Sequence, residues 1–253
     1  MPTLETVERS VDMAGRTKNI LDAELEQLIN RLAEEKRQKA EAAGGEELAR
    51  YNKEYEEYLS VMKHNGRMKK PTIQKLPAIT KFLGISLKEL FELNGAVVEW
   101  PTEEDKAVYE KLHQFTTRDK RELMGLFEDI GPDFLRDAAI MTSLDTPTKR
   151  IRYCSLFRKH PTDMKQILKR CGDDAFNVWN DSKQFSILKL NDVIYLARAL
   201  GVSPAWALCL PKGATLLAST WQEEQAMSDY LLLGENEKRV AFNYIVEIKE
   251  EEG

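Results

Sequence analysis

The residues of this sequence best suited to chemistry are lysines and arginines that gather in two stretches without acidic residues. The first stretch runs from Tyr58 to Lys88, and its basic residues before that lysine are Lys63, Arg67, Lys69, Lys70, Lys75 and Lys81. The second lies between Asp145 and Asp163, and its basic residues are Lys149, Arg150, Arg152, Arg158 and Lys159, followed by Lys165, Lys169 and Arg170. Because ammonium and guanidinium groups neutralise phosphates, each stretch indicates a surface directed at a nucleic acid.

Polar side chains that can read base edges stand beside both groups of cations. Asparagine and glutamine suit adenine, with which they form two hydrogen bonds in one plane, whereas lysine and arginine hold a protein on the phosphate backbone. The residues predicted to bind DNA are Ser60, Lys63, His64, Asn65, Arg67, Lys69, Lys70, Arg158, Lys159, Lys165, Asn177, Asn180, Lys183 and Gln184. The alternative is that these are ordinary polar surface residues around helix turns.

The elements that position the first cationic stretch are predicted to be two short helices. Apolar residues recur there at steps of three and four, which is the spacing of one helical stripe, at Ile73, Leu76, Ile79 and Leu83. Pro71 suits the first turn, where a missing N–H group costs little, and Gly84 predicts a left-handed cap at the end. Ser86 and Glu89 match the capping box of a following helix.

This stretch resembles the second half of a phage-repressor-type helix-turn-helix domain, also called Cro-like or xenobiotic-response-element-like. The matching positions are Asn65, Gly66, Arg67, Lys70, Pro71, Ile73, Leu76, Ile79, Leu83, Gly84, Ile85, Ser86, Leu90 and Phe91. The resemblance implies a five-helix bundle whose third helix enters the DNA major groove. It further implies that a helix begins at Glu46, turns near residues 52–54 and continues as a recognition helix over residues 54–63.

The sequence departs from the family at that turn. Lys53 stands where the family has its turn glycine, and Glu54, Glu56 and Glu57 bring carboxylates to the leading end of the predicted recognition helix. Carboxylates repel phosphates, although the helix dipole favours them at that end. These departures weigh against base reading by the first copy.

The same pattern returns in the second half of the chain, which indicates an internal repeat. Gly84 and Ser86 correspond to Gly201 and Ser203, an offset of 117 residues. Residues 223–248 repeat the pattern of 103–130 at an offset of 118, which pairs Phe115 with Leu233, Lys120 with Lys238, Phe127 with Ile245 and Ile130 with Ile248. In the second copy we expect a first helix over 149–159, a second capped by Thr162, a turn at Gly172 and a recognition helix over 174–181.

The predicted fold class is all-α, with two tandem lambda-repressor-like helix-turn-helix bundles, each followed by a helical hairpin tail. The predicted parts are an N-terminal arm (1–20), a degenerate first bundle (21–95), a helical tail (96–131), a second bundle (132–212) and a C-terminal helical tail (213–253). The two tails carry apolar stripes that could pack against each other or against another chain. Either a monomer or a homodimer joined through the tails is therefore consistent with the sequence.

Composition limits the other function classes. The chain has 253 residues and a formal charge of −5, so nucleic-acid binding must come from local patches. Its three cysteines, Cys154, Cys171 and Cys209, have no metal-ligand or paired spacing, which favours a reducing compartment and predicts no metal. No signal peptide or apolar run of membrane-spanning length is recognised, so we expect a cytoplasmic protein. Nucleotide-binding and hydrolase motifs are absent, so neither an enzyme nor a cofactor is predicted.

The function predicted from these patterns is that of a repressor-like transcriptional regulator that binds double-stranded DNA. The competing hypothesis is a protein-binding scaffold or antirepressor built on degenerate helix-turn-helix domains. The acidic residues at 54–57 and the net negative charge favour the second hypothesis. In a mixed case, copy two binds DNA and copy one holds a protein partner.

Overall fold

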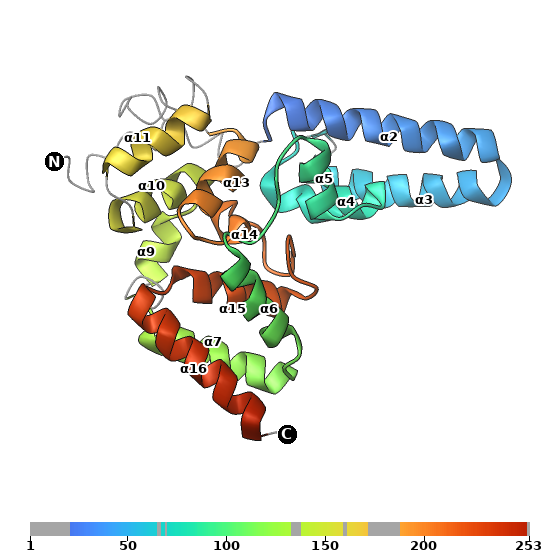
Figure 1. The fold of residues 1–253 in the computed structure, drawn as a ribbon. Coiled ribbons are helices and arrows are strands. Elements are labelled where there is room, and N and C mark those ends of the chain that lie inside the picture. Colours follow the sequence, from blue (N-terminus) through green and yellow to red (C-terminus); the bar gives the residue numbers. More distant parts are fainter. Residues whose placement is uncertain are drawn as a thin grey trace. The chain divides into compact units, whose positions relative to one another are not determined.

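The structure is a computed structural model that describes residues 21–64, 67–68, 70–132, 138–158, 161–171 and 188–251. The backbone alone is described at residues 64, 67–68, 138–139, 157–158, 161–163 and 247–251. The described part is helical apart from one ladder of two-residue strands, which confirms the all-α class (Figure 1). The chain divides into two compact units, residues 1–96 and 97–253.

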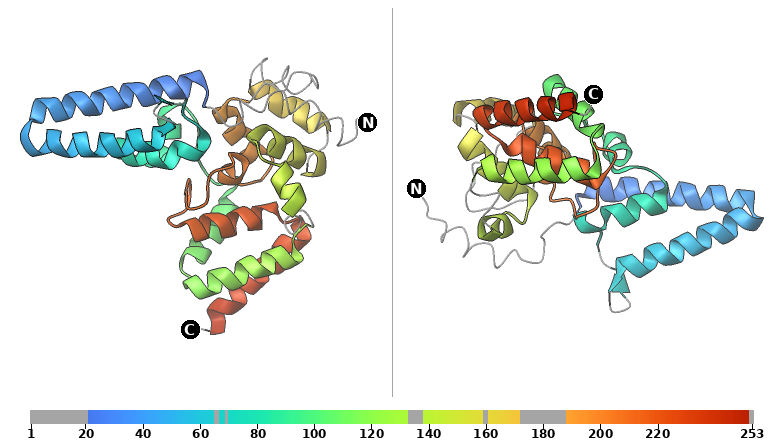
Figure 2. Two further views of the ribbon diagram at one scale, coloured as in Figure 1. Left: turned by 180° about the vertical axis from the view of Figure 1, so that it is seen from behind. Right: turned by 90° about the horizontal axis from the view of Figure 1, so that it is seen from below.

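The first unit is built around a long helical hairpin. Its elements are α2 (Ala23–Ala43), α3 (Gly45–Met62), β1 (Lys63–His64), β2 (Arg67–Met68), the 3-10 helix η1 (Ile73–Lys75), α4 (Leu76–Leu83) and α5 (Leu87–Leu93). The side chain of Asp22 caps α2 by accepting the N–H of Leu25. Gly44, at a φ of 65°, ends α2 and lets α3 return antiparallel beside it (Figures 1 and 2). The two helices of the hairpin therefore meet at Gly44.

The predicted turn within residues 52–54 is wrong, because α3 runs through it without interruption. No glycine or proline interrupts the sequence between Gly45 and Met62. Three tyrosines at helical spacing cross the expected turn, with ring centroids 5.7 Å apart for Tyr51–Tyr55 and 6.1 Å for Tyr55–Tyr58. The Tyr58 ring stacks on Phe82 of α4 at 4.6 Å. This aromatic row favours one straight helix, so copy one has no separate recognition helix.

The closing helices of the first unit follow the predicted capping pattern. Gly84 ends α4 in the left-handed region, at a φ of 74°. Ser86 accepts the N–H of Glu89, and the Glu89 carboxylate accepts the N–H of Ser86, which confirms the capping box. The helix begins later than expected, because a 3-10 turn from Ile73 precedes α4. Local sequence therefore determines this segment.

The second unit joins the second copy to both tails. Its elements are α6 (Glu103–His113), α7 (Thr117–Ile130), α9 (Ala138–Ser143), α10 (Pro147–Arg158), α11 (Pro161–Arg170), α13 (Leu190–Ala199), α14 (Pro204–Ala207), α15 (Trp221–Leu232) and α16 (Glu235–Glu251). α10 packs on α11, α13 and α14, and α11 packs on α13. Gly201, at a φ of 68°, and Ser203 repeat the glycine cap and serine cap of the first copy.

The two predicted tails pack against each other within the chain (Figure 2). Their shared core contains fully buried residues from both tails, among them Leu112, Leu123, Phe127, Met227, Leu231, Leu233 and Ile245. The helices begin at an offset of 118 residues, since α6 and α15 start at Glu103 and Trp221 and α7 and α16 start at Thr117 and Glu235. Of the two alternatives left by the sequence, packing of the tails against each other is therefore the one found within the chain.

Two ion pairs between the tails connect equivalent positions reciprocally. Lys120 of α7 lies 2.7 Å from Glu223 of α15, and Lys238 of α16 lies 3.5 Å from Asp105 of α6. The offset of 118 maps Lys120 onto Lys238 and Asp105 onto Glu223. An exchange of equal contacts is what a symmetric homodimer shows between subunits. Here both partners belong to one chain.

Across the described ranges, no helix is long and apolar enough to cross a membrane.

Candidate nucleic-acid interface

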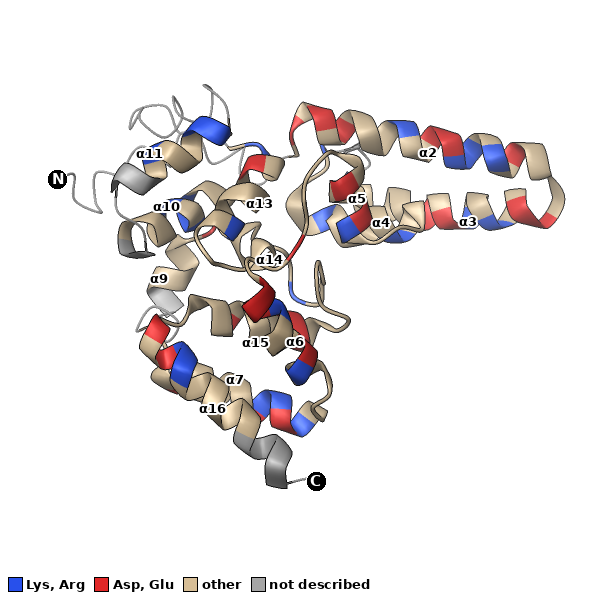
Figure 3. Cartoon of the chain, viewed as in Figure 1, with Lys and Arg blue, Asp and Glu red and all other residues tan. Residues whose placement is uncertain are grey.

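The clearest cationic surface of the second copy lies on α11. Met164 and Leu168 are buried on one face of this helix, where it packs on α10 and α13. Lys165, Lys169 and Arg170 are exposed. Spacings of four and five residues keep the three cations near one another along the helix. Figure 3 shows this basic character at the C-terminal end of α11.

Arg150 of α10, by contrast, makes its contacts within the fold. Arg150 is held by the backbone, with its Nε donating to the Leu144 carbonyl at 2.9 Å and its Nη1 donating to the Trp206 carbonyl. Its guanidinium also lies 4.8 Å from the centre of the Trp206 ring. Burial lowers the pKa of Arg150 and of Arg152. The interpretation of this run as a solvent-facing patch is therefore wrong for these arginines.

Lys149 is likewise engaged within the fold. Its ammonium donates to the Asp145 carboxylate at 2.9 Å and to the Ser143 carbonyl at 3.1 Å. This links the start of α10 to the end of α9. Lys149 and Arg150 of this stretch therefore join parts of the second unit to one another.

The cations of the first copy divide in the same way. Lys75 donates to the Val61 carbonyl at the end of α3, where helix carbonyls lack intrahelical partners. Lys81 lies 4.0 Å from Glu57, and Lys88 lies 3.7 Å from Glu92.

Two cations near the end of α3 remain exposed. Lys63 follows the last turn of α3, and Lys70 precedes η1. A cation is favoured beside the C-terminus of a helix. Both belong to the first cationic stretch of the sequence.

The carboxylates that seemed to oppose DNA binding in copy one are partly neutralised. Glu54 lies 2.6 Å from Lys36 of α2, and Glu57 lies near Lys81 of α4. The hydrogen bond from Lys36 lowers the pKa of Glu54 despite its partial burial. These pairs join α3 to its neighbours, so the acidic residues also support the hairpin.

The predicted DNA-binding residues differ in their exposure and in whether the structure describes them. Ser60 is exposed, but its hydroxyl donates to the Glu57 carbonyl at 2.7 Å. Lys63, Lys70 and Lys165 are exposed. Only the backbone is described at His64, Arg67 and Arg158, and the predicted residues outside the described part are Asn65, Lys69, Lys159, Asn177, Asn180, Lys183 and Gln184. The predicted recognition helix of copy two, residues 174–181, also lies outside it.

Two cations that the predicted set left out, Lys169 and Arg170, complete the α11 surface. Their signal was present in the sequence, because the basic residues alternate with Met164, Ile167 and Leu168 at helical spacing. Charge density alone does not distinguish them from the run in α10. The apolar residues of α11 indicate which side of this helix is buried, and the cations lie outside that side.

Comparisons of the chain with protein-family models, curated proteins and solved structures find no match. The function must therefore be argued from the residues and their arrangement.

Proposed function

We propose that the protein binds double-stranded DNA through its second copy, as a repressor-like regulator. In a helix-turn-helix domain the first helix of the motif crosses the phosphate backbone and the second enters the major groove. On this proposal α11 is the first of these helices, and residues 174–181 supply the second. The second copy would then be a lambda-repressor-like bundle.

The observation that carries this proposal is that α11 is amphipathic. Its apolar face is buried against α10 and α13, and its three described basic side chains are exposed. A helix so oriented can hold a phosphate backbone without disturbing the bundle. Further support comes from the closing segment of copy two, which resembles that of copy one in having a glycine cap at Gly201 and a serine cap at Ser203.

A second function, that of a protein-binding scaffold, is favoured for the first copy by one observation. The continuous α3 leaves no separate helix that could enter a groove. Its exposed face carries carboxylates, among them Glu46, Glu47, Glu56 and Glu57 (Figure 3). Such a surface repels phosphates and suits a basic protein surface instead.

The test is a fluorescence-anisotropy titration of the full chain against a pool of duplexes from genomic fragments at two salt concentrations. Lys165→Glu, Lys169→Glu and Arg170→Glu are combined in one variant. We expect the triple variant to lose binding by at least about tenfold and to reduce the slope of log K against log salt by about three, one unit for each lost phosphate contact.

A matched triple variant controls for net charge. Lys106→Glu, Arg118→Glu and Arg121→Glu make the same charge change on exposed positions of α6 and α7. This variant should keep most of the affinity. Equal loss in both variants, or no DNA binding at low salt by the unmodified chain, would exclude the proposed contact through α11.

A further inference from the structure

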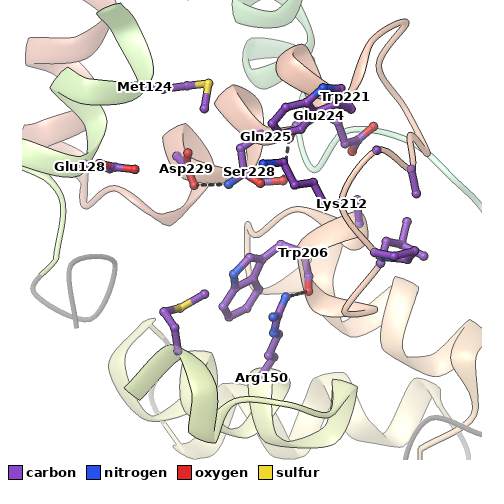
Figure 4. A pocket seen from close by; sticks show the side chains of 16 residues that line it. Met124, Glu128, Arg150, Trp206, Lys212, Trp221, Glu224, Gln225, Ser228 and Asp229 are labelled. Carbon is purple, nitrogen blue, oxygen red and sulfur yellow. Dashed lines mark hydrogen bonds between the residues drawn. The ribbon is translucent and has the colours of Figure 1, made fainter. Parts of the chain in front are cut away.

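A cavity of about 390 Å³ lies within the second unit, between α15 on one side and α10 and α14 on the other (Figure 4). The loop at residues 210–214 and the side chains of Met124 and Glu128 of α7 complete its wall. This volume falls within the usual range for small-molecule sites. Figure 4 shows Trp206 and Arg150 facing a row of polar side chains from α15.

Two buried polar atoms on this wall have no hydrogen-bond partner among the described residues. They are the indole Nε1 of Trp206 and one carboxylate oxygen, Oε1, of Glu224. Trp206 is 7% exposed and Glu224 is 4% exposed. A buried donor or acceptor without a hydrogen bond costs free energy in the folded state. A ligand that forms hydrogen bonds with these two atoms would remove that cost.

The acidic groups of the cavity lack cationic partners. Glu224 accepts three backbone N–H groups through its other oxygen, from residues 216, 217 and 218, at 2.8–2.9 Å. Asp229 is 5% exposed and accepts the Gln225 side-chain amide at 2.9 Å. Across the described part of the chain, no lysine or arginine forms an ion pair with either carboxylate.

A third carboxylate, that of Glu128, adds to the negative field. Burial raises the pKa of Asp229 to about 7, and the neighbouring Glu128 acts in the same direction. A positive charge placed between these two carboxylates would relieve both the burial and the repulsion.

The basic residues that line the cavity make contacts of their own. Arg150 donates to the carbonyls of Leu144 and Trp206 and stacks on the Trp206 ring. The Lys212 ammonium lies 5.0 Å from the centre of the Trp221 ring. A ligand cation would meet carboxylates to which the described residues supply no cationic partner.

We propose that this cavity binds a small organic ammonium compound. Its charged nitrogen would lie between Asp229 and Glu128, and its apolar or aromatic body would lie against Trp206 and Met124. A hydrogen-bond acceptor on the ligand would receive the free indole N–H of Trp206. Within the described residues no group of three His, Cys, Asp or Glu side chains is placed to hold a metal, which favours an organic cation over a metal ion.

The test uses three probes of similar size and different charge, namely 3-phenylpropylamine, 3-phenylpropanol and 3-phenylpropionate. Each is titrated into the full chain at pH 8 by calorimetry, and the tryptophan fluorescence is followed in parallel. We expect the amine to bind at one site with a Kd below about 1 mM and the alcohol and acid to bind at least tenfold more weakly. No binding of the amine, or binding of the acid as tightly as the amine, would overturn the proposal.

Two variants locate the site. Asp229→Asn and Glu128→Gln should each weaken amine binding by about tenfold or more, and Glu128 is exposed, so its substitution leaves the fold intact. Glu122→Gln, which changes another exposed carboxylate of α7, is the matched control and should leave the affinity unchanged. If Glu128→Gln binds the amine as well as the unmodified chain does, the proposed position of the cation is wrong.

Discussion

In copy one α4 leads through Gly84 and Ser86 into α5, and in copy two α13 leads through Gly201 and Ser203 into α14. The segments before these closing helices differ. Copy one has α2 and α3, of 21 and 18 residues, whereas their counterparts in copy two, α10 and α11, have 12 and 10 residues. The repeat is therefore retained where caps and apolar spacing define the backbone, and the helices before that segment differ in length.

This difference teaches that a cationic stretch does not by itself define an interface. Arg150 of copy two is half-buried and donates to the Trp206 carbonyl, and Lys75 of copy one caps the end of α3. In both copies the exposed cations lie beside these internal ones in the sequence. Only the packing of each helix separates the two kinds.

The largest expected effect concerns the reciprocal ion pairs between the tails. Glu223→Gln leaves the Lys120 ammonium without its carboxylate in a site where the side chains are 11% and 2% exposed. We expect a loss of about 3–5 kcal/mol in the free energy of unfolding, measured by urea denaturation. Asp105→Asn should have a smaller effect, because Lys238 lies 3.5 Å away and is less tightly paired.

A double variant distinguishes pairing from packing at this position. Lys120→Met with Glu223→Leu replaces both charges by apolar groups and should recover most of the loss. If Glu223→Gln and Asp105→Asn reduced the free energy of unfolding by the same amount, the two ion pairs would be energetically equivalent, contrary to the prediction.

The next effect is a pH-dependent change in stability that we expect from a substitution in α15 and not from the equivalent substitution in α6. Because burial raises the pKa of Asp229 from 3.8 to about 7, the native state holds a proton between about pH 4 and 7 that the unfolded state has lost. Stability therefore falls as pH rises through this window. Asp229→Asn should stabilise the protein by about 2–4 kcal/mol at pH 8, and the gain should disappear near pH 4.

The equivalent position in the first tail is a control for this change. The offset of 118 places Lys111 there, with its ammonium 4.4 Å from the centre of the Phe242 ring. Lys111→Ala should change stability by about 0.5 kcal/mol, without the same pH window. A pH-independent gain for Asp229→Asn would contradict the raised pKa.

The two glycine caps should respond alike to substitution. Gly84 and Gly201 have φ values of 74° and 68°, and an added methyl group meets nothing within 4 Å at either position. Alanine should therefore cost about 1–2 kcal/mol at each, from backbone strain alone. Thermal unfolding of the two single variants measures this, and a large difference between them would show that the two caps are not equivalent.

The smallest effect tests the continuity of α3. Lys53 is exposed in the middle of this helix, so Lys53→Gly should destabilise the protein by about 1 kcal/mol. Circular dichroism and thermal unfolding would measure the change. If the chain turned at this position, glycine would be neutral or stabilising, and copy one would resemble copy two more closely.

Several features of the fold were predictable because they depend on near neighbours in the sequence. The Ser86–Glu89 capping box, the split between α6 and α7 at Thr116, and the break at Gly44 each follow from residues within one or two helical turns. The continuity of α3 was not predictable from the family pattern. It depends on the stacking of Tyr58 on Phe82, which lies 24 positions later in the sequence.

The candidate site was predicted less completely than the fold. Lys165 was recognised, but Arg150 and Arg152 counted equally in the cationic run although burial lowers the pKa of both. The cavity gave no signal in the sequence, because Glu128 of α7 and Asp229 of α15 line one cavity only after these two helices pack together.

The sequence by itself determined the helical class, the repeat and the positions of the caps, because hydrophobic spacing and capping act over a few residues. Tertiary structure decided which cations face solvent, that the two tails cover each other's apolar faces, and that carboxylates of α7 and α15 line one cavity. Each of these depends on contacts between residues far apart in the chain, and the free energy of burial or pairing is defined only once both partners have been brought together.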